Sequence, residues 1–257
     1  MINCYLLFHK CGNNYVLNVH RIDKETSFVK SVRPHEAADI AGHDRPGVCV
    51  NIRCRNFGSE ALEATGLMDD ESARFLIFTR DPASFIISAA KYHLRGGEQW
   101  ATGTAQEALS GQTLTQALRS ADTPDDQQIV IMKQFDYLYK QQVSLLKYLS
   151  DSRFMRVRCE DIFTSTENAY FAKIASFLRC SAEPSYVDTS SHHAGSESRF
   201  LSALKAASPA FMQTLPHHST GSFVVESPYH ALGAEAKKYY NAHWKEYARA
   251  LGYGCGD

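Results

Sequence analysis

The chain of 257 residues lacks an excess of either charge: 27 lysines and arginines stand against 28 acidic residues, for a formal net charge of −1. Nucleic-acid binding through a broad basic field is therefore not expected, although this balance allows a local basic patch. No apolar run approaches the ~20 residues of a membrane span. The apolar start reaches His9 and Lys10 too soon for a secretory signal. These features predict a soluble, cytoplasmic protein.

The seven cysteines form no Cys-x-x-Cys pair and are scattered along the chain. Zinc sites and disulfide frameworks use close, paired spacings, so the sequence predicts neither. A reducing compartment suits such cysteines. Several of them stand in apolar runs, where a cysteine behaves as a small hydrophobic residue.

Short apolar runs that alternate with helical patterns predict the fold. We expect strands over residues 2–8, 47–54, 74–79 and 154–159, with helical patterns between and after them. Strands separated by helices predict one α/β domain over residues 1–257, with a mostly parallel sheet flanked by helices. Two segments, 95–128 and 180–229, fit this scheme poorly. We expect them to be irregular and to recognise a ligand.

A short segment after the first predicted strand has the features of a phosphate-binding loop. It reads Lys10-Cys11-Gly12-Asn13-Asn14-Tyr15 and precedes a helical pattern. Ligands bind beyond the carboxyl ends of parallel strands, and the free N–H groups of a helix start favour an anion. Gly12 permits close backbone approach. The alternative is a tight turn with a surface lysine, because the loop is not a complete Walker A pattern.

A second cation, Arg80, follows the third predicted strand. Asp81 is a suitable N-cap and Pro82 a suitable first residue for the next helix. Arg80 should share the ligand edge of the sheet with Lys10, and a guanidinium suits bidentate contacts with phosphate. Ser88 lies little more than two helical turns further on. The two cationic strand ends suggest a ligand with two anionic groups. The alternative is an arginine that caps a sheet edge and a serine packed within a helix.

In this order the two motifs resemble those of the sulfotransferases. Three further segments are similar to that family: Arg158-Cys159-Glu160-Asp161-Ile162, Tyr92-His93 with Glu98-Gln99-Trp100 as in bacterial members, and the terminal Leu251-Gly252-Tyr253. The resemblance implies a P-loop-like α/β core and use of 3′-phosphoadenosine 5′-phosphosulfate (PAPS). It implies direct in-line transfer of the sulfuryl group to a hydroxyl or amine of a small-molecule or carbohydrate acceptor. The product is 3′-phosphoadenosine 5′-phosphate (PAP), and no metal is required.

The resemblance also implies roles for single residues. Residues 10–15 would bind the 5′-phosphosulfate, with Lys10 stabilising charge on the bridging oxygen as the sulfuryl group leaves. Arg80 and Ser88 would bind the 3′-phosphate, completed by a late loop at Thr220, Gly221 and Ser222. Glu36 is the candidate catalytic base and His35 the next one, with solvated loop residues as the alternative for both. His20 and His93 are further options.

The sequence departs from the family pattern at three places. Asn13 and Asn14 replace threonine or serine, Cys159 replaces a tyrosine that can contact adenine, and residues 53–56 (Arg53-Cys54-Arg55-Asn56) lack the catalytic histidine of cytosolic members. A non-catalytic sulfotransferase-like protein that binds a nucleotide or a glycan is therefore an alternative. A P-loop phosphotransferase is a further one, although the loop has no Lys-Ser/Thr pair to hold Mg²⁺.

Overall fold

The computed structural model of the chain describes residues 2–11, 27–40, 50–96, 98–164, 168–178 and 227–254. These residues belong to two compact units. The sheet unit comprises Met1–Arg80 and Lys140–His192, and the helical unit comprises Asp81–Tyr139 and His193–Asp257. The single domain that the sequence predicts over residues 1–257 stays a prediction.

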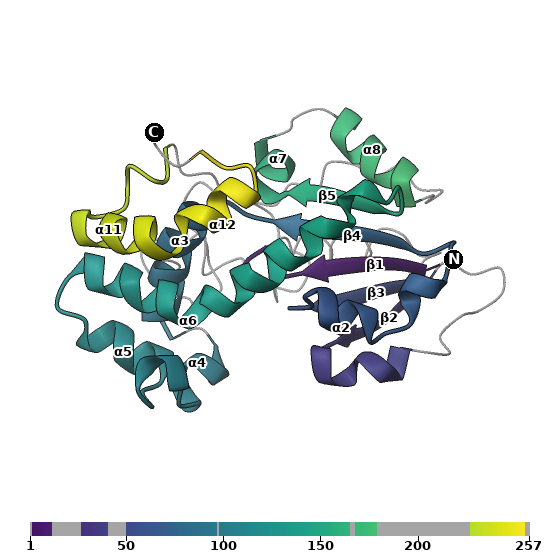
Figure 1. Ribbon diagram of the computed structural model, residues 1–257. Helices are drawn as coiled ribbons and strands as arrows, with labels where there is room; N and C mark the ends of the chain where they lie inside the picture. The colour runs from purple at the N-terminus through teal and green to yellow at the C-terminus, as the bar shows by residue number, and fades with distance from the viewer. Residues whose placement is uncertain are drawn as a thin grey trace, which may run out of the picture. The chain divides into compact units, whose positions relative to one another are not determined.

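The sheet unit contains a five-stranded sheet in which every pair of neighbours is parallel (Figure 1). The strand order is β2-β3-β1-β4-β5, so β1 lies at the centre. All of β1 is buried, as expected for a parallel strand that is covered on both faces. This confirms the predicted α/β fold with a parallel sheet flanked by helices. The strands are β1 (Ile2–Leu7), β2 (Ser27–Val32), β3 (Val50–Arg55), β4 (Arg74–Thr79) and β5 (Phe154–Arg158).

The sequence predicts four of these five strands and misses β2. This strand lies at the edge of the sheet and contains two serines and a lysine among its six residues. An edge strand needs no continuous apolar run, so its sequence gives a weak signal. The helical pattern expected after the first strand falls outside the described residues.

Helices lie between the strands of the sheet unit or follow its last strand. They are η1 (Pro34–Ile40), α2 (Ser59–Glu63), η2 (Leu67–Asp69), η4 (Leu145–Ser150), α7 (Cys159–Thr164) and α8 (Asn168–Leu178). The last turns of α6 (Pro124–Ser144) also belong to this unit. Gly58 lies so close to α6 that a Cβ there would stand 1.5 Å from Gln141 Oε1. A side chain at this position would require the Gln141 amide to move.

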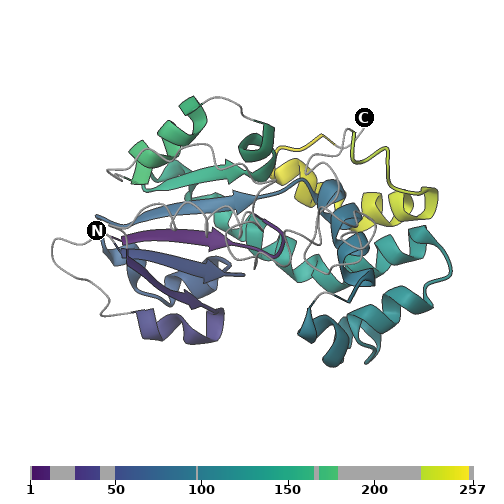
Figure 2. The same ribbon diagram turned by 180° about the vertical axis from the view of Figure 1, so that it is seen from behind.

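The helical unit consists of α3 (Pro82–Leu94), α4 (Gln99–Gly103), η3 (Glu107–Leu109), α5 (Leu114–Ser120), the first turns of α6, α11 (Ala234–His243) and α12 (Lys245–Ala250) (Figure 2). Aromatic rings fill its core. The ring centroid of Phe85 lies 5.2 Å from that of Phe135 and 5.4 Å from that of Tyr139, and Tyr139 lies 4.6 Å from Trp244. None of the described helices combines the length and apolar character that crossing a membrane requires.

The segment 95–128 is not irregular, and that part of the prediction is wrong. It forms α4, η3, α5 and the start of α6 because short apolar stretches are buried and the starts of α5 and α6 are capped. Thr113 and Gln116 form a capping box at α5. The proposed role of this segment in ligand recognition stays a prediction. The second segment, 180–229, lies outside the described residues up to position 226.

Helix α3 begins with the cap that the sequence predicts. The Asp81 carboxylate accepts a hydrogen bond of 2.7 Å from Ser84 N, and Pro82 follows Asp81. We expect Asp81→Ala to lower the free energy of unfolding by about 1–2 kcal/mol, because the helix loses an N-cap acceptor. Asp81→Asn keeps an acceptor oxygen and should lose less. Urea unfolding measures both, and equal losses in the two variants would contradict the capping role.

Candidate anion site at the carboxyl edge of the sheet

A basic residue stands at or just beyond the carboxyl end of each of the five described strands. Because the strands are parallel, these ends share one edge of the sheet. The residues are Arg33 after β2, Arg55 at the end of β3, Lys10 after β1, Arg80 after β4 and Arg158 at the end of β5. Positive charge therefore gathers at this edge in a chain of net charge −1. Such a donor set suits a phosphate or sulfate ligand.

Lys10 and Arg80, the two cations singled out in the sequence, are in direct contact. Arg80 Nη1 donates a hydrogen bond of 3.2 Å to the Lys10 carbonyl oxygen, and Arg80 is only 7% exposed. Lys10 has a φ of +59°, in the left-handed region that residues other than glycine rarely adopt. The turn is closed by Cys11 N, which donates to Phe8 O at 3.0 Å. Surrounding contacts thus hold the lysine in a strained backbone conformation.

Cys11 anchors the same turn to two other elements of the sheet unit. Gln142 of α6 donates from Nε2 to the Cys11 sulfur at 3.9 Å, and the side chains of Cys11 and Cys159 are hydrogen-bonded. This bond and burial raise the pKa of the Cys159 thiol, against the opposing effect of the Arg80 charge. Cys159 is 1% exposed. Its side chain supports the turn from inside and has almost no surface to offer an adenine ring.

The two candidate bases lie in η1, which follows β2 at the same edge of the sheet. Glu36 Oε2 accepts a hydrogen bond of 3.0 Å from Arg33 N, and Glu36 N donates to Arg33 O at 2.9 Å. The Glu36 carboxylate therefore caps the start of its own helix. Glu36 is partly buried, whereas His35 is exposed.

The remaining predicted contacts are less well defined by the structure. Ser88 lies in the second turn of α3, is partly buried, and its hydroxyl makes no hydrogen bond to the described residues. Gly12, Asn13, Asn14 and Tyr15 lie outside the described residues, and so does the late loop of Thr220, Gly221 and Ser222. Their roles stay predictions.

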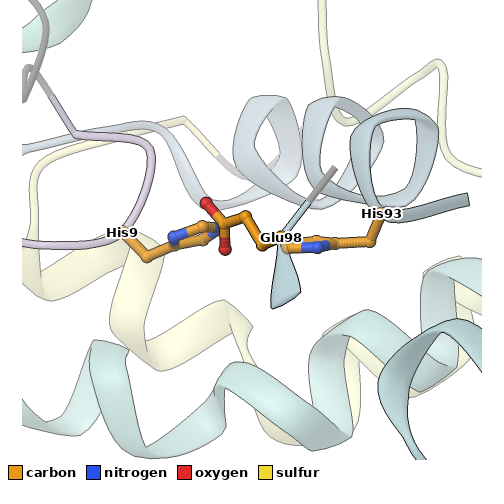
Figure 3. A group of neighbouring side chains, drawn as sticks. All are labelled: His9, His93 and Glu98. Atoms are coloured by element: carbon orange, nitrogen blue, oxygen red, sulfur yellow. The ribbon is translucent and has the colours of Figure 1, made fainter. Parts of the chain in front are cut away.

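His93, a further option for the base, is enclosed in the helical unit. It is fully buried, and the rings of Tyr92 and Trp100 lie 5.0 and 5.3 Å from its own. Glu98 accepts hydrogen bonds from Tyr92 Oη at 3.2 Å and from Trp100 Nε1, and its carboxylate lies within 4.8 Å of a His93 ring nitrogen (Figure 3). Burial and the Glu98 charge raise the pKa of Tyr92. These contacts favour a packed histidine over a base that meets an acceptor.

The end of β3 carries two arginines, Arg53 and Arg55, to which sequence analysis assigns no role. Arg53 and Arg55 pair in register with Tyr5 and Leu7 of β1, and alternation along a strand places both arginines on one face. Burial and the charge of Arg55 lower the pKa of Arg53. The sequence signal is the Arg-x-Arg spacing at the end of a strand.

Comparisons with known proteins bear on the fold. A scan against protein-family models and a search of curated proteins gave no match. Among solved structures, the chain is similar to the mouse sulfotransferase SULT7A1, crystallised in complex with PAP. The match has a TM-score of 0.55 and 12% sequence identity, and covers 96% of this chain and 84% of that chain. At this identity the likeness shows that the two proteins share a fold.

Proposed function

We propose that this protein is a sulfotransferase that moves the sulfuryl group of PAPS to a hydroxyl, or an amine, of a small-molecule or carbohydrate acceptor by direct in-line transfer. The observation that carries the proposal is the contact of Lys10 with Arg80 at the basic carboxyl edge of the sheet. The motif order in the sequence and the fold shared with a sulfotransferase crystallised with PAP support it.

The residues at this edge fit a donor with two anionic ends. When bound, PAPS would supply the sulfuryl group and depart as PAP. Lys10 is partly buried, and its Nζ would stabilise negative charge that develops on the leaving phosphate. The nearly buried Arg80 would hold the 3′-phosphate, because its guanidinium is only weakly screened by solvent. The further contacts predicted from the sequence, Cys11–Tyr15, Ser88 and residues 220–222, belong to the same proposal.

Glu36 is the proposed base. It would accept the proton that the acceptor oxygen loses as its bond to sulfur forms and the bond from sulfur to the phosphate oxygen breaks. The hydrogen bond from Arg33 N orients the carboxylate. We expect Glu36→Gln, which keeps the shape but cannot take the proton, to lower kcat about 10²-fold with little change in PAP affinity.

His35→Ala is the matched comparison, because His35 is the exposed neighbour of Glu36 on the same short helix. Its kcat should stay close to that of the wild type. Initial rates of PAP formation measure both variants. A loss in His35→Ala alone would assign the base to His35 instead.

Binding of PAP tests the donor assignment without knowledge of the acceptor. The unfolding midpoint is measured with and without millimolar PAP and, in parallel, with ATP and Mg²⁺. A ligand at about 100 times its dissociation constant adds about 2.7 kcal/mol of stability, so PAP should raise the midpoint. Stabilisation by ATP and Mg²⁺ alone would favour a phosphotransferase. Stabilisation by neither ligand would contradict the proposal.

A further inference from the structure

The carboxyl edge of the sheet holds more positive charge than the proposed donor uses. The donor's two anionic ends are assigned to the cations that follow β1 and β4. Arg33 and Arg55 stand on the other side of this edge, on the neighbouring strands β2 and β3. Val32 of β2 pairs in register with Cys54 of β3, so Arg33 and Arg55 are the next residue on each strand. Both arginines are exposed.

The guanidinium groups of these two arginines are not ion-paired within the described part of the chain. Neither the Arg33 nor the Arg55 guanidinium makes a hydrogen bond or an ion pair there, whereas Arg153 and Arg249 are paired with carboxylates at 2.7 Å. Arg55 also repels Arg53, whose pKa is lowered by burial and by the Arg55 charge. An anion bound at Arg55 would offset this repulsion.

The backbone around Arg55 is firmly positioned. Asn56, directly after it, has a φ of +60° and donates from its N–H to Leu7 O at 2.7 Å. Leu7 is the register partner of Arg55, and Lys10, with its own φ of +59°, follows shortly after Leu7. Two left-handed residues other than glycine therefore stand at neighbouring strand ends. Asparagine adopts this conformation readily, so the strain lies at Lys10, and backbone strain is concentrated at binding sites.

We infer that the acceptor is anionic, and that Arg55 together with Arg33 binds its carboxylate or sulfate group. The inference rests on the proposed function. It places the charged group of the acceptor on the β2–β3 side of the edge, away from the strand ends assigned to the donor. Glu36, the proposed base, follows Arg33 by one turn of η1 and accepts a hydrogen bond from its N–H. Arg33, which would bind the anion, and Glu36, which would take the proton, thus belong to one short segment.

The test compares charged and neutral ligands that differ at one substituent, bound to the protein saturated with PAP. One set is D-glucuronate, D-glucose 6-sulfate and D-glucose. The other is 4-hydroxybenzoate, 4-hydroxybenzenesulfonate and 4-methylphenol, which covers a phenolic acceptor. Calorimetry should show the charged members binding at least about tenfold tighter than the neutral one, with weaker binding at high salt. The preferred charged member shows whether the group is a carboxylate or a sulfate.

Arg55→Ala should remove this preference and Arg55→Lys should keep part of it, because lysine retains the charge but not the bidentate geometry. Arg249→Ala is the matched control: Arg249 is an exposed arginine on α12 of the helical unit, outside both segments predicted to recognise a ligand. It should bind all six ligands as the wild type does. If Arg55→Ala does not fold, Arg33→Ala provides the same comparison.

Each failure has a distinct meaning. Absence of PAP binding would refute the proposed function and this inference with it. Normal PAP binding combined with equal affinity for charged and neutral ligands, or with no binding of the charged ligands at millimolar concentration, would overturn the inference alone. It would also be overturned if Arg55→Ala weakened PAP binding and left the charge preference intact, because Arg55 would then serve the donor.

Discussion

Lys10→Gly is expected to lower kcat for sulfuryl transfer about 10³-fold, because the side chain that stabilises charge on the leaving phosphate is lost. The same variant should be at least as stable as the wild type. Lys10 adopts a φ of +59°, and glycine takes that conformation without the steric cost of a Cβ. Single-turnover rates and urea unfolding measure the two effects separately.

Lys10→Ala is the control for this double effect. It loses the same amine and should lose the same activity, but it keeps the strained backbone. It should therefore be about 1 kcal/mol less stable than Lys10→Gly. Activity that survives in either variant would contradict the catalytic assignment, whereas equal stability of the two variants would contradict only the argument from strain.

Arg80→Ala is expected to weaken PAP binding about 10³-fold. The substitution removes a bidentate contact, in which two charge-assisted hydrogen bonds contribute about 1.5–3 kcal/mol each. Arg80 is only 7% exposed, so solvent does little to screen the charge of its guanidinium. The variant also loses the hydrogen bond to the Lys10 carbonyl oxygen. Arg80→Lys should be intermediate, since it keeps the charge and loses the planar fork.

The matched ligand is adenosine 5′-monophosphate, which lacks the 3′-phosphate. The wild type should bind PAP much more tightly than this nucleotide, and Arg80→Ala should bind the two almost equally in calorimetric titrations. If the substitution instead lowered the affinity for both ligands by the same factor, Arg80 would act by holding the Lys10 turn and not by binding the 3′-phosphate.

The strands that could be predicted are those with several apolar residues in succession or in alternation, including β5 at one edge of the sheet. The segments for β1, β4 and β5 are short apolar runs, and their ends differ from the predicted ones by one residue at most. β2 was missed because two serines and a lysine among its six residues leave little apolar signal. The segment 95–128 was misjudged because its helices are only three to seven residues long. Periodicity cannot be recognised over so few residues.

The proximity of Lys10 and Arg80 could be predicted from the sequence, because parallel strands bring their carboxyl ends to one edge of the sheet. The contacts that hold this turn did not follow. The hydrogen bond between the Cys11 and Cys159 thiols joins residues 148 positions apart in the sequence, and no local pattern signals it. The significance of Arg55 depends on β3 lying beside β1, and local patterns do not specify the order of strands.

The most direct measurement is turnover of PAPS by the wild type with a panel of neutral and anionic acceptors that carry a hydroxyl or an amine. Lys10→Gly is the inactive control, here called the blank. Chromatography follows PAP, and mass spectrometry follows the sulfated product. We predict that PAP and one sulfated product form in equal amounts with the wild type and not with the blank. PAP binding without product from any acceptor would contradict the account and leave a nucleotide-binding protein on a sulfotransferase fold.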